Sequence, residues 1–105
     1  YKKELLLLEQ VKFPSYRNGE IPLWIDVQVL NRTGLSEHLK KNDIYTRDCW
    51  PAVHRNPPYQ NQGCDKDFPN SSFISDNYLW LPNGPGVTEK SIKMVCDHIK
   101  EFYSK

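Results

Sequence analysis

The chain has 105 residues, which is room for one domain with a modest hydrophobic core. A formal net charge of +1 gives no basic excess, and this argues against a nucleic-acid-binding protein and against binding to an anionic membrane. The apolar run Leu5–Leu8 is far shorter than the ~18–20 residues that a membrane-spanning helix requires.

The start of the chain and its cysteines bear on what precedes the chain and on the compartment in which it folds. The sequence begins at Tyr1 without a methionine and without the apolar core of a signal peptide, so we expect residues upstream that this chain does not include. Cys49, Cys64 and Cys96 are odd in number and form no C-x-x-C pair. This pattern argues against a secreted disulfide framework and favours the reducing cytoplasm.

The first half of the chain predicts two helices and two strands. Tyr1–Gln10 resembles the end of a helix whose apolar side is Leu5, Leu6 and Leu8. Leu23–Leu30 is predicted to be a strand, because apolar residues alternate there with Trp24, Asp26 and Gln28.

A break is expected at Asn31–Gly34, where turn-forming residues end the alternation. A short helix over Leu35–Lys41 and a second strand over Ile44–Arg47 follow. Residues 48–66 form a long irregular stretch, and its aromatic residues argue for a functional loop rather than a disordered one.

The second half is predicted to hold a helix over Phe68–Asn77 and then a strand, a turn and a helix. Tyr78–Leu81 is a short apolar run, and Pro82–Gly86 is the turn. Thr88 is the expected N-cap of the last helix. Its buried stripe comprises Ile92, Val95, Cys96, Ile99, Phe102 and Tyr103. The fold class is α/β (α+β): about three mainly antiparallel strands with helices packed on one side.

Candidate site residues gather in Thr46–Tyr59. Arg47 and His54 are the polar groups, and Trp50 and Tyr59 offer flat aromatic faces. An arginine fork binds phosphate or carboxylate, and an aromatic face packs on a nucleobase or a sugar ring. The alternative is that Trp50 and neighbouring prolines cover an edge of the core while His54 only satisfies a backbone carbonyl.

Other chemistry finds less support. A metal site from Cys49, His54 and Cys64, with His98, lacks the close ligand pairs of structural zinc sites. No cysteine carries a local nucleophile signature, and Cys96 is predicted to be buried on the helix stripe. We expect surface positions for Lys66, Lys90 and Lys93, rather than the apolar setting that imine chemistry needs. The Gly84–Gly86 turn lacks the pattern of a phosphate-binding loop. We therefore expect no metal site and no catalytic residue in this chain.

Two segments together carry a family resemblance. TRDCWPAVHRNPPY and YLWLPNGPGVTEKSIKMVCDHIKEF resemble the C-terminal domain of the DegT/DnrJ/EryC1/StrS sugar aminotransferases, with perosamine synthase-like members nearest. The turn Leu81–Gly84 followed by Val87 and Thr88 is similar to the ending of that family. The pattern arginine, aromatic, proline, histidine, proline, tyrosine is matched from Arg47 to Tyr59. Asn83 and Cys49 depart from the commoner residues.

The resemblance implies a function for a longer protein. Such enzymes use pyridoxal phosphate to transfer an amino group, with glutamate as the expected donor, to a nucleotide-linked keto-sugar in polysaccharide biosynthesis. The resemblance also implies a cytoplasmic homodimer whose catalytic large domain, with the imine-forming lysine, is absent from residues 1–105. Arg47, Trp50, His54 and Tyr59 would then bind substrate, and this chain alone would be inactive.

Two other functions remain open. The chain could be a free-standing, non-catalytic binding or interaction module with the same fold. Single-stranded nucleic-acid binding through Trp50, Tyr59 and Arg55 is disfavoured by the near-neutral charge.

Overall fold

In the computed structural model, which describes residues 1–105, four strands form one antiparallel sheet in the order β1-β2-β4-β3. The strands are β1 (Val11–Lys12), β2 (Ile25–Val29), β3 (Arg47–Asp48) and β4 (Tyr78–Leu81). The prediction of a small, mainly antiparallel sheet is confirmed. It has one strand more than expected, because no strand was predicted at Val11–Lys12.

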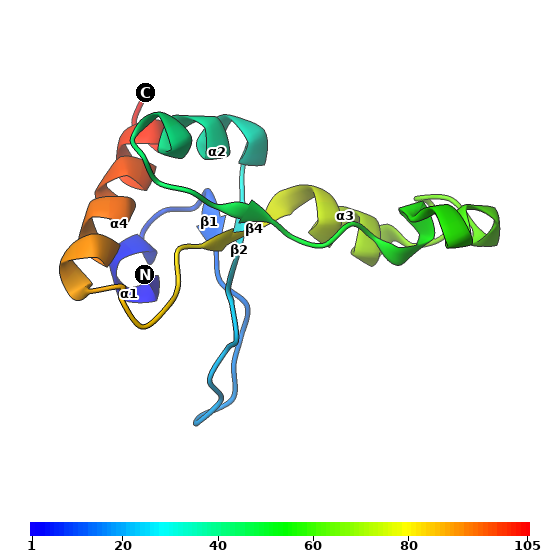
Figure 1. The fold of residues 1–105 in the computed structure, drawn as a ribbon, viewed down its shortest axis with the longest axis horizontal. Helices are drawn as coiled ribbons and strands as arrows, with labels where there is room; N and C mark the ends of the chain where they lie inside the picture. The colour runs from blue at the N-terminus through cyan, green and yellow to red at the C-terminus, as the bar shows by residue number, and fades with distance from the viewer.

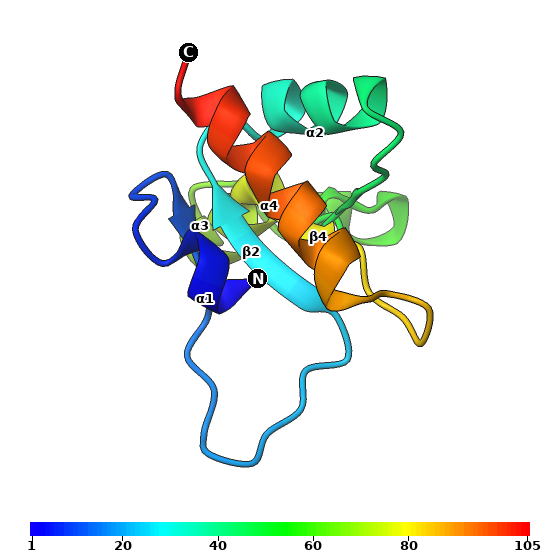
Figure 2. The ribbon, with the colours of Figure 1, turned by 90° about the vertical axis from the view of Figure 1, so that its left-hand side faces the viewer.

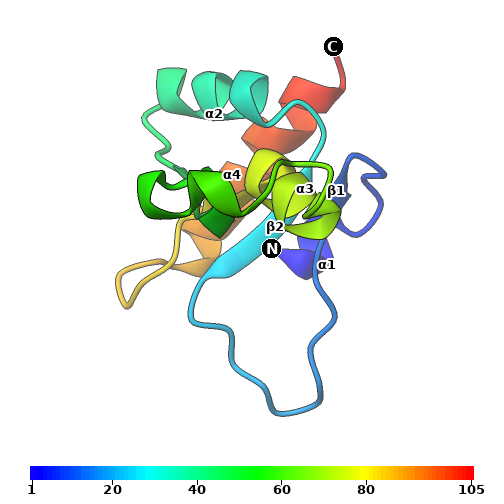
Figure 3. The ribbon, with the colours of Figure 1, turned by 90° about the vertical axis from the view of Figure 1, so that its right-hand side faces the viewer.

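Three helices lie on one face of the sheet: α1 (Lys2–Leu5), α2 (Arg32–Lys41) and α4 (Glu89–Tyr103) (Figures 1 and 2). The opposite face carries α3 (Pro69–Asn77) and the 3-10 helices η1 (Val53–Arg55) and η2 (Pro57–Gln62). These last three elements form an arm, residues 53–77, that projects from the sheet (Figures 1 and 3). None of the helices is long and apolar enough to cross a membrane.

The core lies between the sheet and the helices on its first face. Val27 of β2 and Leu79 of β4 are paired in register and fully buried. Strand residues alternate between the two faces, so Leu79 and Leu81 point into this core while Tyr78 and Trp80 point to the other side. The twelve buried members of the core are Leu5, Val11, Val27, Val29, Leu35, Leu39, Ile44, Leu79, Leu81, Val95, Cys96 and Ile99.

The predictions for the second half of the chain are confirmed. The strand Tyr78–Leu81 has the predicted bounds, and α3 begins one residue later than expected. In α4 the hydroxyl of Thr88 accepts a hydrogen bond from the backbone N–H of Ser91 at 3.1 Å. This bond satisfies one of the free N–H groups of the first turn, as an N-cap should.

The helix predicted over Tyr1–Gln10 is wrong. Only Lys2–Leu5 is helical, and Leu6 is 70% exposed. The chain then turns into β1, whose backbone pairs with Gln28 and Val29. This pairing depends on a partner distant in sequence, so local periodicity does not show it.

Three predicted bounds in the first half also needed correction. The strand over Leu23–Leu30 is shorter, and Leu23 is 73% exposed in the long loop that leads into β2. The expected break at Asn31–Gly34 is instead the start of α2. Asn31 adopts a left-handed φ of 53°, and its side chain accepts a hydrogen bond from the N–H of Gly34. The strand expected over Ile44–Arg47 begins only at Arg47.

Candidate functional site

Three tryptophans cover the face of the sheet that α2 and α4 leave free. Trp80 is central: its ring stacks on Trp24 at 4.6 Å between centroids and meets the edge of Trp50 at 5.4 Å. Its indole N–H donates a hydrogen bond of 2.6 Å to Asp26, its partner across the sheet. Trp24, Trp50 and Trp80 are called the tryptophan cluster below. Trp80 is buried, whereas Trp50 is 61% exposed and so presents an aromatic surface.

Arg47 borders this cluster. It lies opposite Trp80 in the β3–β4 register, and its guanidinium carbon is 5.9 Å from the Trp80 ring centroid. A guanidinium at this distance from an aromatic face gains a cation–π interaction. Arg47 is exposed and forms no ion pair, so its hydrogen-bond donors are available to a ligand.

His54 lies in the arm and is buried. Its Nε2 is 2.7 Å from Oδ1 of Asp65, and its ring stacks on Phe68 at 4.8 Å. The hydroxyl of Ser72 is 3.4 Å from the same nitrogen. These contacts join η1 to α3 and engage Nε2 of His54 within the arm.

Arg55 anchors the arm through two carboxylates. Its guanidinium binds Asp65 through Nε and Nη2, and it binds Asp76 of α3 at 2.7 Å and 3.0 Å. Hydrogen bonds from Arg55, and then from His54, lower the pKa of Asp65 to about 2. The pKa of Asp76 is also lowered, mainly by its hydrogen bond from Arg55. Arg55 is therefore committed to the fold, unlike Arg47.

Tyr59 and His54 line one shallow pocket of the arm. The pocket has a volume of about 140 Å³. Its lining residues are Val53, His54, Tyr59, Gln62, Phe68 and Ser71. Pockets for whole cofactors or drug-sized ligands measure about 300–1,000 Å³, so this pocket can hold only part of such a ligand.

The structure thus brings the four predicted site residues together as two pairs. Arg47 and Trp50 lie at the tryptophan cluster, and His54 and Tyr59 lie at the arm pocket, which the first pair does not line. Sequence reasoning missed Trp80 and Asp65. The alternation over Leu23–Leu30 predicts that Trp24 and Asp26 point away from the core. This was the sequence signal from which the tryptophan cluster could have been found.

The predicted surface lysines are exposed, and no lysine of the chain is buried. Lys100, the least exposed, pairs with Glu4. A lysine that forms an imine needs an apolar setting or a cationic neighbour to lower its pKa. The residues present therefore do not form a covalent pyridoxal phosphate site by themselves.

The cysteines are all free, and Cys96 is buried as predicted. The alternative metal set is not brought together, because His54 is bound to Asp65 in the arm while His98 lies on α4 across the sheet (Figure 1). Instead, His98 lies close to His38 and Glu101, with one ligand atom of each residue within 4.8 Å of the others.

Comparison with known proteins gives consistent matches in sequence. Residues 7–100 match the DegT/DnrJ/EryC1/StrS aminotransferase family. The chain is 32% identical over 92 residues to the GDP-perosamine synthase of Vibrio cholerae, covering 88% of this chain and 25% of that protein. It is 29% identical over 109 residues to the GDP-perosamine synthase of Escherichia coli O157:H7, covering 99% of this chain and 29% of that protein. The chain thus spans less than a third of the length of these relatives.

Solved structures share the fold. DesV of S. venezuelae superposes with a TM-score of 0.89 at 23% identity, covering 99% of this chain and 29% of that one. A DegT DnrJ EryC1 StrS aminotransferase from Brucella abortus gives 0.81 at 21% identity, covering 99% of this chain and 28% of that one. The family match extends over nearly the whole chain, from before β1 into the last turns of α4. This chain therefore belongs to the DegT/DnrJ/EryC1/StrS aminotransferase family.

Proposed function

We propose that this chain is the C-terminal small domain of an enzyme that transfers an amino group to a nucleotide-linked keto-sugar, with pyridoxal phosphate as cofactor. The observation that carries the proposal is the match of residues 7–100 to an aminotransferase family, together with 32% identity to a GDP-perosamine synthase. A large domain elsewhere in the protein would hold the cofactor, because no lysine here is buried. Glutamate is the proposed amino donor, and a cytoplasmic homodimer is the proposed assembly.

The tryptophan cluster and Arg47 are the proposed substrate-facing surface. A nucleotide-linked sugar combines two phosphates with flat or ring-shaped groups. Arg47 carries a free guanidinium fork for a phosphate, and the exposed ring of Trp50 offers a face for packing. Both lie beside Trp80, on the face of the sheet opposite α2 and α4.

His54 and Tyr59 are proposed to contribute from the arm. Tyr59 is 48% exposed at the mouth of the arm pocket and can meet a ligand. His54 lines the same pocket, but its Nε2 is engaged by Asp65. Its proposed part is therefore to fix the wall of the pocket that substrate or the large domain meets.

Amino transfer in the reverse direction tests this function. The complete reading frame that carries this chain would be expressed, loaded with pyridoxal phosphate, and mixed with GDP-perosamine and 2-oxoglutarate. Transfer moves the amino group of the sugar to 2-oxoglutarate and releases glutamate and the keto-sugar nucleotide. Glutamate formation supports the proposal, and its absence from a folded, cofactor-loaded enzyme contradicts it.

Substitution of Arg47, compared with substitution of a second arginine, tests the proposed substrate-facing surface. Arg47→Met is expected to raise KM for the nucleotide-linked sugar at least about tenfold, since a charge-assisted hydrogen bond contributes about 1.5–3 kcal/mol. Arg17→Met removes an exposed arginine of the loop before β2 and should leave KM unchanged. Equal effects of the two substitutions would remove Arg47 from the proposed surface.

A non-catalytic binding module is the second candidate, because the exposed aromatic surface is complete within this chain. Titration of the isolated chain with GDP-linked sugars, followed by tryptophan fluorescence, separates the two candidates. Tight binding by the isolated chain favours the module. No response until a large domain is present favours the enzyme part.

A further inference from the structure

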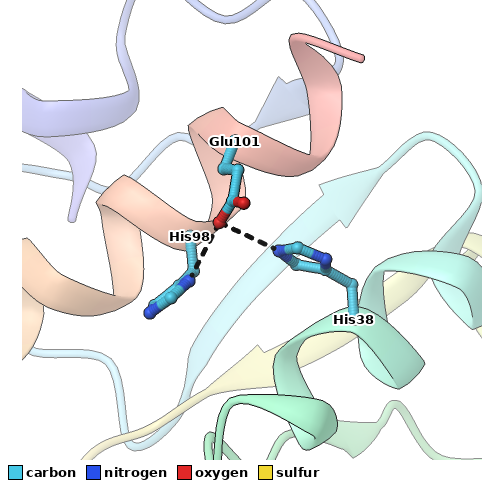
Figure 4. A group of neighbouring side chains, drawn as sticks. All are labelled: His38, His98 and Glu101. Atoms are coloured by element: carbon cyan, nitrogen blue, oxygen red, sulfur yellow. Dashed lines mark hydrogen bonds and ion pairs between the residues drawn. The ribbon is translucent and has the colours of Figure 1, made fainter.

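Three side chains that the proposed function does not use converge between α2 and α4. His38 comes from α2, and His98 and Glu101 come from α4 (Figure 4). One ligand atom from each residue lies within 4.8 Å of the other two. The two helices that carry the group lie on the other side of the sheet from the arm (Figure 1).

The packing of the two helices produces this convergence. His98 and Glu101 are three residues apart and so point to the same side of α4. His38 reaches them from the facing helix, where its ring packs against Phe102 at 5.5 Å and against His98 at 6.2 Å. The three side chains are therefore held by the fold rather than by a flexible loop.

Two of the three distances between ligand atoms are close to those around a bound zinc ion. Oε2 of Glu101 is 3.2 Å from Nδ1 of His98 and 3.7 Å from Nε2 of His38. Bonds of about 2.0–2.1 Å in a tetrahedral zinc site place neighbouring ligand atoms about 3.3 Å apart. The ligand atoms of the two histidines lie within 4.8 Å of each other, so His38 and His98 must move closer together to reach this spacing.

His38 also has an unfulfilled polar atom. Its Nε2 is buried and has no hydrogen-bond partner, since 3.7 Å to Glu101 is too long for a hydrogen bond. A buried polar atom without a partner costs free energy. A cation between the three residues would satisfy this nitrogen and use it as a ligand.

We propose that His38, His98 and Glu101 bind one Zn²⁺ ion that joins α2 to α4. Two imidazoles and a carboxylate form a donor set that zinc accepts, with the fourth position left to water. Glu101 is half exposed, so this position faces solvent. Its other oxygen, Oε1, lies 3.7 Å from Lys105, which leaves Oε2 to the histidines.

Calorimetric titration of the purified, tag-free protein with ZnCl₂, after removal of metal by a chelator, tests the site. We expect one zinc ion per chain and a higher Tm with zinc than with chelator, because a ligand that binds only the folded state stabilises it. Co²⁺ in place of zinc should give the visible absorption of a tetrahedral site. No zinc binding would overturn the proposal and leave a simple histidine–glutamate contact.

The variants decide where the ion binds. His38→Gln and His98→Gln should each weaken zinc binding at least about tenfold, since the loss of even an outer-shell partner costs 10–100-fold. Glu37→Gln, an exposed acid beside His38 on α2, should bind zinc as the parent does. Far-UV circular dichroism would verify that each variant is folded. If His38→Gln unfolds, His98→Gln still tests the site, because the His98 side chain is partly exposed. Unchanged affinity in the folded histidine variants would contradict this site.

Discussion

Replacement of Trp80 by phenylalanine should destabilise the domain by about 2 kcal/mol. The change removes the indole N–H that donates a 2.6 Å hydrogen bond to the Asp26 carboxylate. A hydrogen bond to a charged group contributes about 1.5–3 kcal/mol, and the half-buried position of Asp26 allows water to replace part of it. The smaller ring also loses overlap with Trp24 and Trp50, and an aromatic pair contributes about 0.5–1.5 kcal/mol.

Urea unfolding followed by far-UV circular dichroism measures this loss without depending on tryptophan fluorescence. Trp24→Phe is the matched control, because Trp24 is 41% exposed and its indole N–H makes no hydrogen bond. We expect it to cost less than about 1 kcal/mol. A double-mutant cycle of Trp80→Phe with Asp26→Asn should show coupling of about 1 kcal/mol. If Trp80→Phe costs no more than Trp24→Phe, the hydrogen bond has no role in stability.

Four further predictions concern Asp65, two tyrosines, the N-cap of α4 and the lysines. Arg55 lowers the pKa of Asp65 from 3.8 to about 2. The stability that this carboxylate adds is therefore present above pH 3.8 and is lost as the pH falls towards 2. Between pH 3.8 and pH 2, the urea midpoint of Asp65→Asn should decline less steeply than that of the parent protein. Burial raises the pKa values of Tyr1 and Tyr103 to about 12, so absorbance titration should show two late phenols, and Tyr103→Phe should remove one. Thr88→Ala should cost about 1 kcal/mol in urea unfolding while Thr88→Ser costs little, and equal losses would exclude the cap as the cause. Borohydride treatment of the isolated chain with pyridoxal phosphate should leave no stable adduct on any one lysine by mass spectrometry, because none is buried, and one specific adduct would contradict this.

Local sequence signals were sufficient for the end of the chain. The β4–turn–α4 unit was predicted correctly because its apolar run, its Pro/Gly turn and its Thr88 cap act over a few residues. β1 was missed because its two residues are a strand only through pairing with β2. A break after the strand was predicted at Asn31–Gly34, yet the left-handed conformation of Asn31 lets its side chain cap α2.

The candidate site was predicted less completely, for a spatial reason. Arg47, Trp50, His54 and Tyr59 lie within thirteen residues of sequence, but the chain leaves the sheet for the arm between Trp50 and His54. Spacing therefore did not show that they form two pairs. The contact that makes Trp80 central joins two strands 54 residues apart in sequence, and periodicity gives no information over that distance.

The two edge strands of the sheet have a consequence for assembly. β1 and β3 contain two residues each, and β3 exposes Arg47 and Asp48. Short, charged borders offer few free backbone groups to a foreign strand, which discourages growth of the sheet into aggregates. Any lasting association of this domain must therefore form through side-chain surfaces, and a partner that adds a strand would have almost no template.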